Sequence, residues 1–277
     1  MTTASASRRW ALVTGASAGI GAAFARELAS RGACLVLTAR RAERLESLAA
    51  EVSARHGIEA VGLVADLADP ATPEALCAEL AKRGIAIDIL VNNAGYGVPG
   101  DFHTQPWRTH ADFLQVLVTA PCELAYRLLP GMRGRGYGRI ANIASLAGHV
   151  PAAAGHTLYA AAKAFMIKFS ESLAVENAVH GVSVTAVCPG FTYSEFHDVT
   201  GSRAVVSRMP AWMWLTAEEV ARQGLDALER GVPVYVNGRI NRLIKTLTDL
   251  LPDRLALALV KRQSRRYRLR DAKGTSE

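Results

Sequence analysis

The stretch Trp10-Ala-Leu-Val-Thr14-Gly15-Ala-Ser-Ala-Gly19-Ile-Gly21 determines how we expect this chain to fold. Residues 10–14 form a short apolar run, which predicts a buried strand, and residues 22–31 are amphipathic and predict a helix. A glycine-rich turn between a strand and a helix lets a ligand approach the backbone. The helix N-terminus then directs N–H groups and a positive dipole at that ligand. The stretch therefore predicts a phosphate-binding turn.

The alternation of strand and helix continues along the chain. Apolar runs predict further strands at residues 33–38, 60–65, 87–91, 139–144, 182–187 and 232–236. Amphipathic periods predict helices at residues 42–55, 73–82, 112–129, 157–180 and 216–230. Strands separated by helices of this length indicate βαβ units. We expect an α/β fold of the Rossmann type, doubly wound, with a mainly parallel seven-stranded sheet flanked by helices on both faces.

The composition indicates one large domain with an appendage. The chain has 277 residues, of which 50% are hydrophobic, and we predict a dinucleotide-binding and catalytic domain at 1–238 and a basic extension at 239–277. No apolar run approaches the ~18 residues of a membrane-spanning helix, and residues 1–9 do not resemble a signal peptide. Cys34 and Cys188 fall in apolar runs and are expected to be core thiols. This pattern favours a reducing, cytoplasmic location.

Tyr159 and Lys163 are separated by three alanines. Positions i and i+4 of a helix lie on one face, so the phenol and the ammonium project into the same space. A nearby cation lowers a phenol pKa, which would make Tyr159 a proton donor or acceptor near neutral pH. Ser145 follows the apolar run 139–144 and could add a hydroxyl. The alternative is an ordinary surface pair.

The end of the second predicted strand carries Arg40 and Arg41, and no carboxylate occurs between residues 33 and 42. In dinucleotide-binding folds an acidic residue here holds the ribose 2′-hydroxyl, whereas an arginine accommodates a 2′-phosphate. The sequence therefore favours NADPH over NADH, with Arg40 as the predicted contact. The alternative is that one of the two arginines is only a solvated residue at the start of a helix.

Several motifs in order resemble the short-chain dehydrogenase/reductase family over about residues 10–236. The resemblance rests on the glycine turn, on Asp66 after the third strand, on the Asn92-Asn93-Ala94-Gly95 segment, on Ser145, Tyr159 and Lys163, and on Pro189, Gly190 and Thr192. It implies an NAD(P)(H)-dependent oxidoreductase, either a carbonyl reductase or an alcohol dehydrogenase. Members transfer a hydride between the nicotinamide and a carbonyl or a secondary alcohol.

The resemblance also implies roles for residues. Tyr159 would protonate the carbonyl oxygen, Ser145 would hydrogen-bond that oxygen, and Lys163 would lower the tyrosine pKa and bind the nicotinamide ribose. No metal is expected. The implied NADP(H)-binding residues are Gly15, Ser17, Gly19, Ile20, Gly21, Arg40, Asp66, Asn92, Ala94, Gly95, Tyr159, Lys163, Pro189, Gly190 and Thr192.

The chain departs from the family at Leu117, about where many members have an asparagine that holds a proton-relaying water. No asparagine occurs from residue 94 to residue 141, so a shifted alignment does not supply one. Gln115 could take its place, or water could reach Lys163 by another route. The departure also leaves open a second class of function, a non-catalytic NADP-binding sensor or scaffold on the same fold.

The substrate is indicated only by the residues that follow the sixth strand. The stretch 191–215 contains the large apolar residues Phe196, Met209, Trp212, Met213 and Trp214. These could line a pocket for a hydrophobic ketone or secondary alcohol, or they could belong to the core or to a subunit interface. His149, His156 and His197 show no metal-ligand spacing and are expected to be exposed loop residues.

The C-terminal segment differs from the rest in charge. Residues 239–270 contain ten Lys/Arg and two Asp/Glu, a local charge of +8, whereas the remainder of the chain is near −1. An apolar stripe runs from Ile240 to Leu251, and it could lie on an anionic membrane surface or pack on the body or on a second subunit. No nucleic-acid-binding motif is present. We expect a homodimer or homotetramer.

Overall fold

The computed structural model describes residues 8–151, 155, 157–193, 210–252 and 255. Its sheet has seven strands in the order β3-β2-β1-β4-β5-β6-β7, and every pair of neighbours is parallel. The strands are β1 (Trp10–Thr14), β2 (Cys34–Ala39), β3 (Ala60–Val64), β4 (Ile87–Asn92), β5 (Gly138–Ile143), β6 (Val182–Cys188) and β7 (Val234–Val236). The predicted Rossmann-type fold is confirmed.

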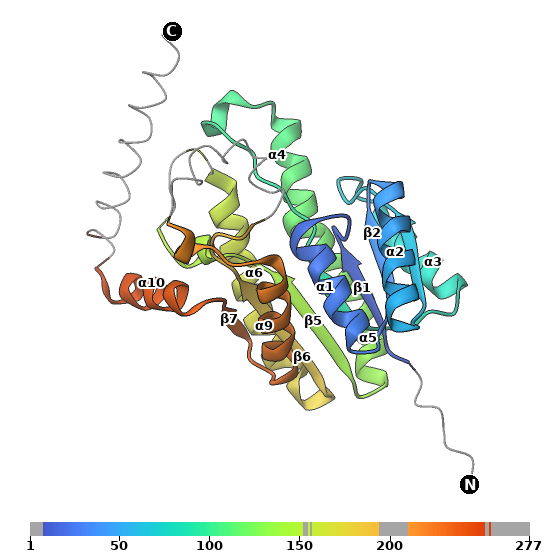
Figure 1. Ribbon diagram of the computed structural model, residues 1–277. Helices are drawn as coiled ribbons and strands as arrows, with labels where there is room; N and C mark the ends of the chain where they lie inside the picture. Colours follow the sequence, from blue (N-terminus) through green and yellow to red (C-terminus); the bar gives the residue numbers. More distant parts are fainter. Residues whose placement is uncertain (1–7, 152–154, 156, 194–209, 253–254, 256–277) are drawn as a thin grey trace.

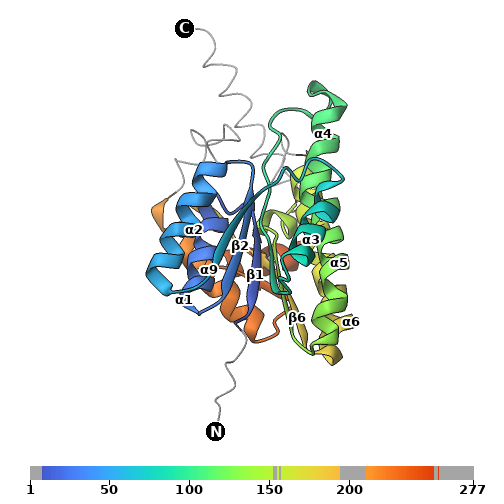
Figure 2. The same ribbon diagram turned by 90° about the vertical axis from the view of Figure 1, so that its right-hand side faces the viewer.

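Helices cover both faces of this sheet (Figures 1 and 2). One face is covered by α1 (Gly19–Ser30), α2 (Ala42–His56) and α9 (Ala217–Glu229). The other is covered by α3 (Thr72–Lys82), α4 (Trp107–Leu114), α5 (Ala120–Gly134) and α6 (Thr157–Asn177). A further helix, α10 (Arg239–Leu250), follows β7 at the end of the sheet.

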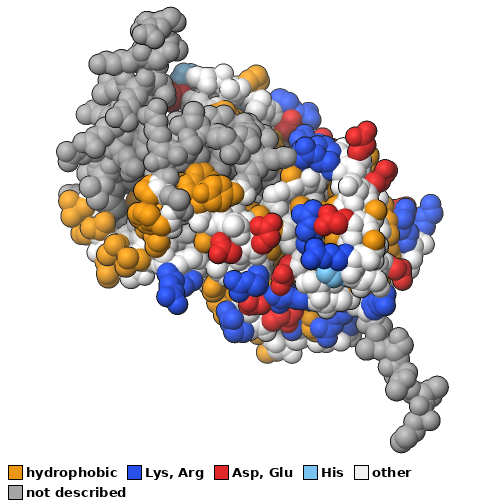
Figure 3. Space-filling view, in the orientation of Figure 1, with side chains coloured by type: hydrophobic (Ala, Val, Ile, Leu, Met, Phe, Trp, Pro, Cys, Tyr) orange, Lys and Arg blue, Asp and Glu red, His pale blue; other side chains and the backbone are white. Residues whose placement is uncertain are grey.

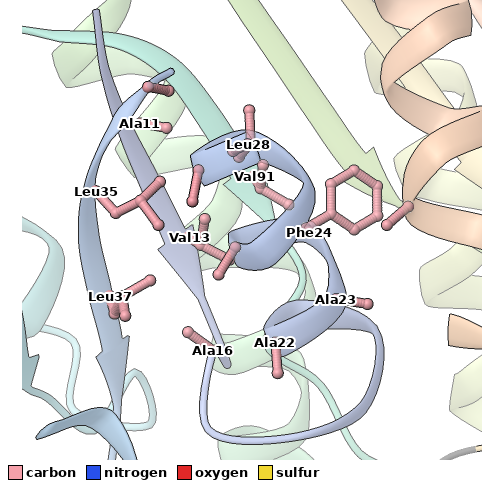
Figure 4. Close-up of a cluster of buried hydrophobic side chains, with 14 of the residues drawn as sticks. Ala11, Val13, Ala16, Ala22, Ala23, Phe24, Leu28, Leu35, Leu37 and Val91 are labelled. Atoms are coloured by element: carbon pink, nitrogen blue, oxygen red, sulfur yellow. The ribbon is translucent and has the colours of Figure 1, made fainter. Parts of the chain in front are cut away.

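The two faces follow from the alternation of side chains along each strand. In β1, Ala11 and Val13 pack towards α1, whereas Leu12 packs on the opposite face. Phe24 of α1 is fully buried in the layer between the sheet and α1. Figure 4 shows part of this layer, including Phe24 and Leu35. Burial on both faces explains why the strands are continuous apolar runs.

The strand order reverses at β1, which pairs with β2 on one side and β4 on the other. In open parallel sheets, ligands bind outside the carboxyl ends of the strands at such a switch point. The residues that follow β1, β2, β4, β5 and β6 all lie at this edge. The topology therefore gathers the motifs that are far apart in the sequence.

The largest error in the predicted elements concerns the helix at 112–129. The structure has α4 starting at Trp107, a π-helical turn η2 (Gln115–Thr119) and then α5 continuing to Gly134. A π-turn inserts a residue into a helix without changing its apolar character, so hydrophobic periodicity did not detect it. Other boundaries shift by up to three residues: α1 begins at Gly19, α6 ends at Asn177, and the last strand begins at Val234.

Cys34 and Cys188 are buried free thiols, as predicted. None of the described helices is long and apolar enough to cross a membrane. The division of the chain at residue 238 stays a prediction.

Candidate functional site

The glycine turn is held to the neighbouring strand by the side chains of Thr14 and Asn93. The Thr14 Oγ1 accepts hydrogen bonds from the backbone N–H groups of Asn93 and Ala94, each at 3.0 Å. The Asn93 Nδ2 donates to the carbonyl oxygens of Thr14 at 2.9 Å and Gly15 at 3.2 Å. These bonds fix the turn at the switch point between β1 and β4.

The turn requires glycine. Gly15 and Gly19 have φ values of 66° and 53°, in the left-handed region that favours glycine. A Cβ at Gly21 would collide with the Gly15 carbonyl oxygen and the Asn93 side chain. Among the described residues, no side chain caps the first turn of α1, and that turn contains no acidic residue. This end of α1 therefore suits an anionic phosphate.

An arginine, Arg41, contacts the turn, and the assignment of Arg40 to a cofactor 2′-phosphate stays a prediction. The Arg41 Nε and Nη2 donate to Ser17 Oγ at 3.1 and 2.9 Å. Arg41 is the N-cap residue of α2, whereas Arg40 lies one residue earlier and is exposed. Sequence order identified the pair, but it could not show which guanidinium turns towards Ser17.

Ser145 lies between the ends of two strands and α6. It follows β5 in an extended conformation and begins the short helix η3 (Leu146–Gly148). The Leu146 N–H donates to the Pro189 carbonyl oxygen at 2.9 Å. A Cβ at Gly148 would lie only 2.8 Å from the Ala164 nitrogen of α6. This close approach seats the serine loop on the helix that carries Tyr159.

The side chains of Ser145, Tyr159 and Lys163 lie together. A hydrogen bond joins Ser145 and Tyr159. The Lys163 Nζ lies 5.6 Å from the centroid of the Tyr159 ring and donates to the Ile143 carbonyl oxygen at 2.6 Å. Lys163 is 7% exposed, so its ammonium is almost completely desolvated.

The predicted lowering of the tyrosine pKa is wrong in this structure. Burial raises the pKa of Tyr159 to about 12, and the smaller effect of the Ser145 hydrogen bond only opposes this rise. Burial also lowers the pKa of Lys163 to about 8. Desolvation disfavours the charged form of both groups and is the largest cause of both shifts. At neutral pH the phenol is protonated and most of the lysine is charged.

The segment after β6 adjoins the serine loop. Pro189 is buried, and the Thr192 Oγ1 donates to the Gly190 carbonyl oxygen at 3.1 Å. The Asn241 side chain of α10 packs directly on Gly190, where a Cβ would come within 2.6 Å of the Asn241 Cγ.

Asp66 is exposed just after β3, where its Oδ1 accepts from the Ala68 N–H at 3.0 Å.

Asn92 lies below the site in a buried polar network. Its Nδ2 donates to Asn142 Oδ1 at 2.9 Å, and the Asn142 Nδ2 donates to Ser170 Oγ at 2.8 Å. Asn92 is 5% exposed. The network joins β4, β5 and α6, so it holds together three of the elements that carry the site. Direct contact between Asn92 and a cofactor stays a prediction.

Leu117 is a core residue in the π-helical turn η2. It is 2% exposed, and its Cγ lies 3.5 Å from the position of a Cβ on Gly95. The nearby Gln115 has a buried Nε2 with no hydrogen-bond partner among the described residues. The only side-chain amide that η2 contributes is therefore at Gln115, two residues before Leu117.

A small hollow of about 10 Å³, enough for about one water molecule, adjoins Tyr159. Its apolar lining comes mainly from Val98, Phe102, Phe113 and Leu158. His110 also lines it and is 5% exposed, with Nε2 2.8 Å from the Phe102 carbonyl oxygen. The His110 Nδ1 has no hydrogen-bond partner among the described residues. Sequence reasoning missed His110, because an isolated histidine in an amphipathic helix carries no motif.

The predicted apolar cluster at 191–215 is described only in part. Trp214 stacks on Tyr193, with ring centroids 4.6 Å apart, and Trp212 is 63% exposed. Phe196 and Met209 lie outside the described residues, as do His156 and His197. His149 was expected to be exposed but is partly buried, because η3 packs on α6.

Comparison with known proteins agrees with this geometry. A sequence model of the family described as short chain dehydrogenase matches residues 9–203. The 3-oxoacyl-[acyl-carrier-protein] reductase of Haemophilus influenzae is 35% identical over 215 residues, which cover 76% of this chain and 87% of that protein. The very-long-chain 3-oxoacyl-CoA reductase of Anas platyrhynchos is 31% identical over 267 residues, 94% of this chain and 81% of that one.

Among solved structures, the short-chain dehydrogenase from Sphingobium yanoikuyae in complex with NADPH superposes with a TM-score of 0.76 and 31% identity, covering 88% of this chain and 97% of that chain.

In the described part of this chain, no group of three or more His, Cys, Asp or Glu residues could hold a metal ion. The family match spans more than half of the chain, and the fold and the clustered Ser, Tyr and Lys accord with it. The chain belongs to the short-chain dehydrogenase family of oxidoreductases.

Proposed function

We propose that this protein is an NADPH-dependent carbonyl reductase that acts on hydrophobic ketones. The observation that carries the proposal is the cluster of Ser145, Tyr159 and Lys163, at the same sheet edge as the glycine turn and beside a small hollow with several apolar lining residues. A protein that only bound a nucleotide would not require a proton donor beside such a hollow.

The residues around the glycine turn fit a nicotinamide dinucleotide phosphate. The start of α1 offers uncapped N–H groups to a phosphate, and the absence of Cβ atoms at Gly15 and Gly21 allows close approach. Arg41 lies where a 2′-phosphate would be expected, and Arg40 is beside it. The Sphingobium relative was solved with NADPH. When bound, NADPH supplies the hydride.

The protein's own contribution is proton transfer and charge stabilisation. Tyr159, with a pKa raised to about 12, keeps its proton at neutral pH and can donate it to the substrate oxygen. Ser145 adds a hydrogen bond to the same oxygen. The Lys163 ammonium, anchored on the Ile143 carbonyl oxygen, stabilises the negative charge that develops on Tyr159.

The side chains that line this small hollow favour an apolar substrate with at least one polar group. Val98, Phe113 and Leu158 provide hydrocarbon surface next to the Tyr159 ring. His110 is tethered through Nε2 to Phe102, and its remaining nitrogen offers one buried hydrogen-bonding position. The two relatives named for 3-oxoacyl thioesters act on a ketone within an acyl chain. A 3-oxoacyl compound or a related long-chain ketone fits this combination.

We also propose that the protein is a homodimer or homotetramer. Apolar side chains are exposed on α5 and on α6 and its continuation, namely Tyr126 at 77%, Val175 at 77% and Val179 at 85%. Exposed apolar side chains of this size on neighbouring helices favour burial against a second subunit. Size-exclusion chromatography with light scattering would measure the assembly directly, and a monomer would exclude it.

The experiment that tests the function measures NADPH oxidation against a panel of carbonyl compounds. The panel should contain 3-oxoacyl thioesters of increasing chain length, simple aliphatic and aryl ketones, and sugars. We expect turnover that rises with apolar chain length and is lost in Tyr159→Phe. NADPH binding without turnover of any compound would contradict the proposal and would favour a non-catalytic NADP-binding sensor or scaffold.

A further inference from the structure

The helix α10 has an inner face that attaches it to the body of the protein. Asn241 is 3% exposed, packs on Gly190 and donates through Nδ2 to the Asn237 carbonyl oxygen at 2.8 Å. Ile240 and Ile244 are partly buried on the same side. Arg242 donates to the Val236 carbonyl oxygen at 3.1 Å. The orientation of α10 is thus fixed by contacts in its first turns.

The outer face of α10 is an exposed apolar stripe. Leu243, Leu247 and Leu250 follow one another at helical spacing and are 58%, 54% and 76% exposed. Leu251 and Leu255 are also exposed just beyond the helix. Figure 3 shows hydrophobic side chains gathered over this end of the molecule. The inner face already joins the helix to the body, so packing on the body does not explain these leucines.

Basic residues occur on α10 and in the sequence that follows it. Arg239 and Arg242 are exposed on α10 itself, and Lys245 is paired with Asp249 at 2.6 Å. The sequence from residue 251 to residue 270 contains one acidic residue, Asp253, and seven basic residues, namely Arg254, Lys261, Arg262, Arg265, Arg266, Arg268 and Arg270. The partner of this surface should therefore be apolar and anionic at once.

A second copy of this chain does not meet that requirement. A two-fold interface places the same patch of each subunit opposite itself, so the exposed Arg239 and Arg242 of the two subunits would approach one another. The surface of an anionic bilayer offers a hydrocarbon layer for the leucines and phosphate headgroups for the arginines. We propose that α10 docks this protein on anionic lipid membranes, with Leu243, Leu247 and Leu250 inserted and the basic residues at the headgroups.

Docking through α10 would also orient the catalytic site. The inner face of the helix contacts Gly190, and the adjacent Pro189 accepts a hydrogen bond from the loop of Ser145. The exposed Trp212 lies in η5 (Ala211–Met213), and Leu215, just after it, approaches Gly238 at the start of α10. The membrane-facing side would therefore adjoin the end of the site that holds the reacting groups.

The test uses the full chain and vesicles of two compositions, phosphatidylcholine alone and phosphatidylcholine with phosphatidylglycerol. We expect co-sedimentation with the anionic vesicles at low ionic strength, little with the neutral ones, and weakening as salt is added. The double variant Leu243→Glu with Leu247→Glu should lower the vesicle-bound fraction by about tenfold or more, because carboxylates oppose insertion and lie near anionic headgroups.

The matched control is Val64→Glu with Ala50→Glu, which adds the same charge at exposed positions of β3 and α2, Val64 being 62% exposed. It should bind vesicles like the unmodified protein, and thermal unfolding should show that both double variants fold. Absence of binding at low salt, or equal losses in the two variants, would overturn the proposal. A change of oligomeric state in the Leu243/Leu247 variant, without vesicle binding by the unmodified protein, would instead identify a subunit interface.

Discussion

The site has two halves, which differ in what holds their residues in place. One half surrounds the glycine turn, and the other surrounds the hollow beside Tyr159. In the first half, the backbone itself is constrained by the left-handed Gly15 and Gly19 and by the hydrogen bonds of Thr14 and Asn93. In the second half, single side chains such as His110 and Leu158 come from different helices and meet only through packing.

This difference means that a change in either half should affect different quantities. The turn half uses backbone groups and glycines, so its substitutions should act on cofactor binding. The half around the hollow uses side chains whose burial sets their protonation, so its substitutions should act on turnover, its pH dependence or the stability of the core. The following predictions separate these effects, beginning with the largest.

Tyr159→Phe should reduce turnover by about 10³-fold while leaving the affinity for NADPH nearly unchanged, because only the phenolic proton is removed. Steady-state rates and fluorescence titration with NADPH would measure the two quantities. Tyr126→Phe is a matched control, since Tyr126 is 77% exposed on α5. A Tyr159→Phe protein with an unchanged rate would show that another group donates the proton.

Leu117→Asn should destabilise the protein by about 3 kcal/mol, because it removes a buried side chain and leaves an amide among apolar neighbours. Chemical denaturation would measure the free energy of unfolding. Leu243→Asn, at a position that is 58% exposed, should have a much smaller effect. Higher turnover with unchanged stability would instead mean that the family's asparagine relay can be restored at this position.

Arg41→Ala should weaken NADPH binding by about tenfold and leave NADH binding unaffected, on the scale of one lost hydrogen bond to a charged group. Arg40→Ala is the matched comparison and should have the smaller effect. Isothermal titration with both cofactors would measure the four affinities. A larger loss from Arg40→Ala would show that Arg40, the residue predicted from the sequence, contacts the 2′-phosphate.

The rate of carbonyl reduction should fall by about fourfold between about pH 7 and about pH 8.5, because Lys163 loses its charge as the pH rises through its pKa of about 8. Tyr159, with a pKa of about 12, keeps its proton over this range. A pH–rate profile at saturating NADPH would show a single descending limb. A rate that rises over this range would contradict the assignment of charged Lys163 to the active form.

Much of this protein could be predicted from local patterns. The run from Trp10 to Gly21 identified the first strand, the turn and the helix, and the spacing of Tyr159 and Lys163 placed both on one helix face. These features depend on the periods of strand and helix and on the conformational freedom of glycine, which neighbouring residues determine. The membership of the sheet followed from the alternation of the elements.

Other features depended on contacts between distant segments. Burial raised the pKa of Tyr159 although Lys163 lies beside it, and desolvation is a property of the whole fold. The contact of Arg41 with Ser17, the π-turn at Leu117 and the hollow at His110 arose in the same way. For α10, the sequence determined an amphipathic basic helix, and only the tertiary structure decided that Ile240 and Ile244 face the body while the leucines face outward. A helix period shows which residues share a face, but the partner of that face is set by packing.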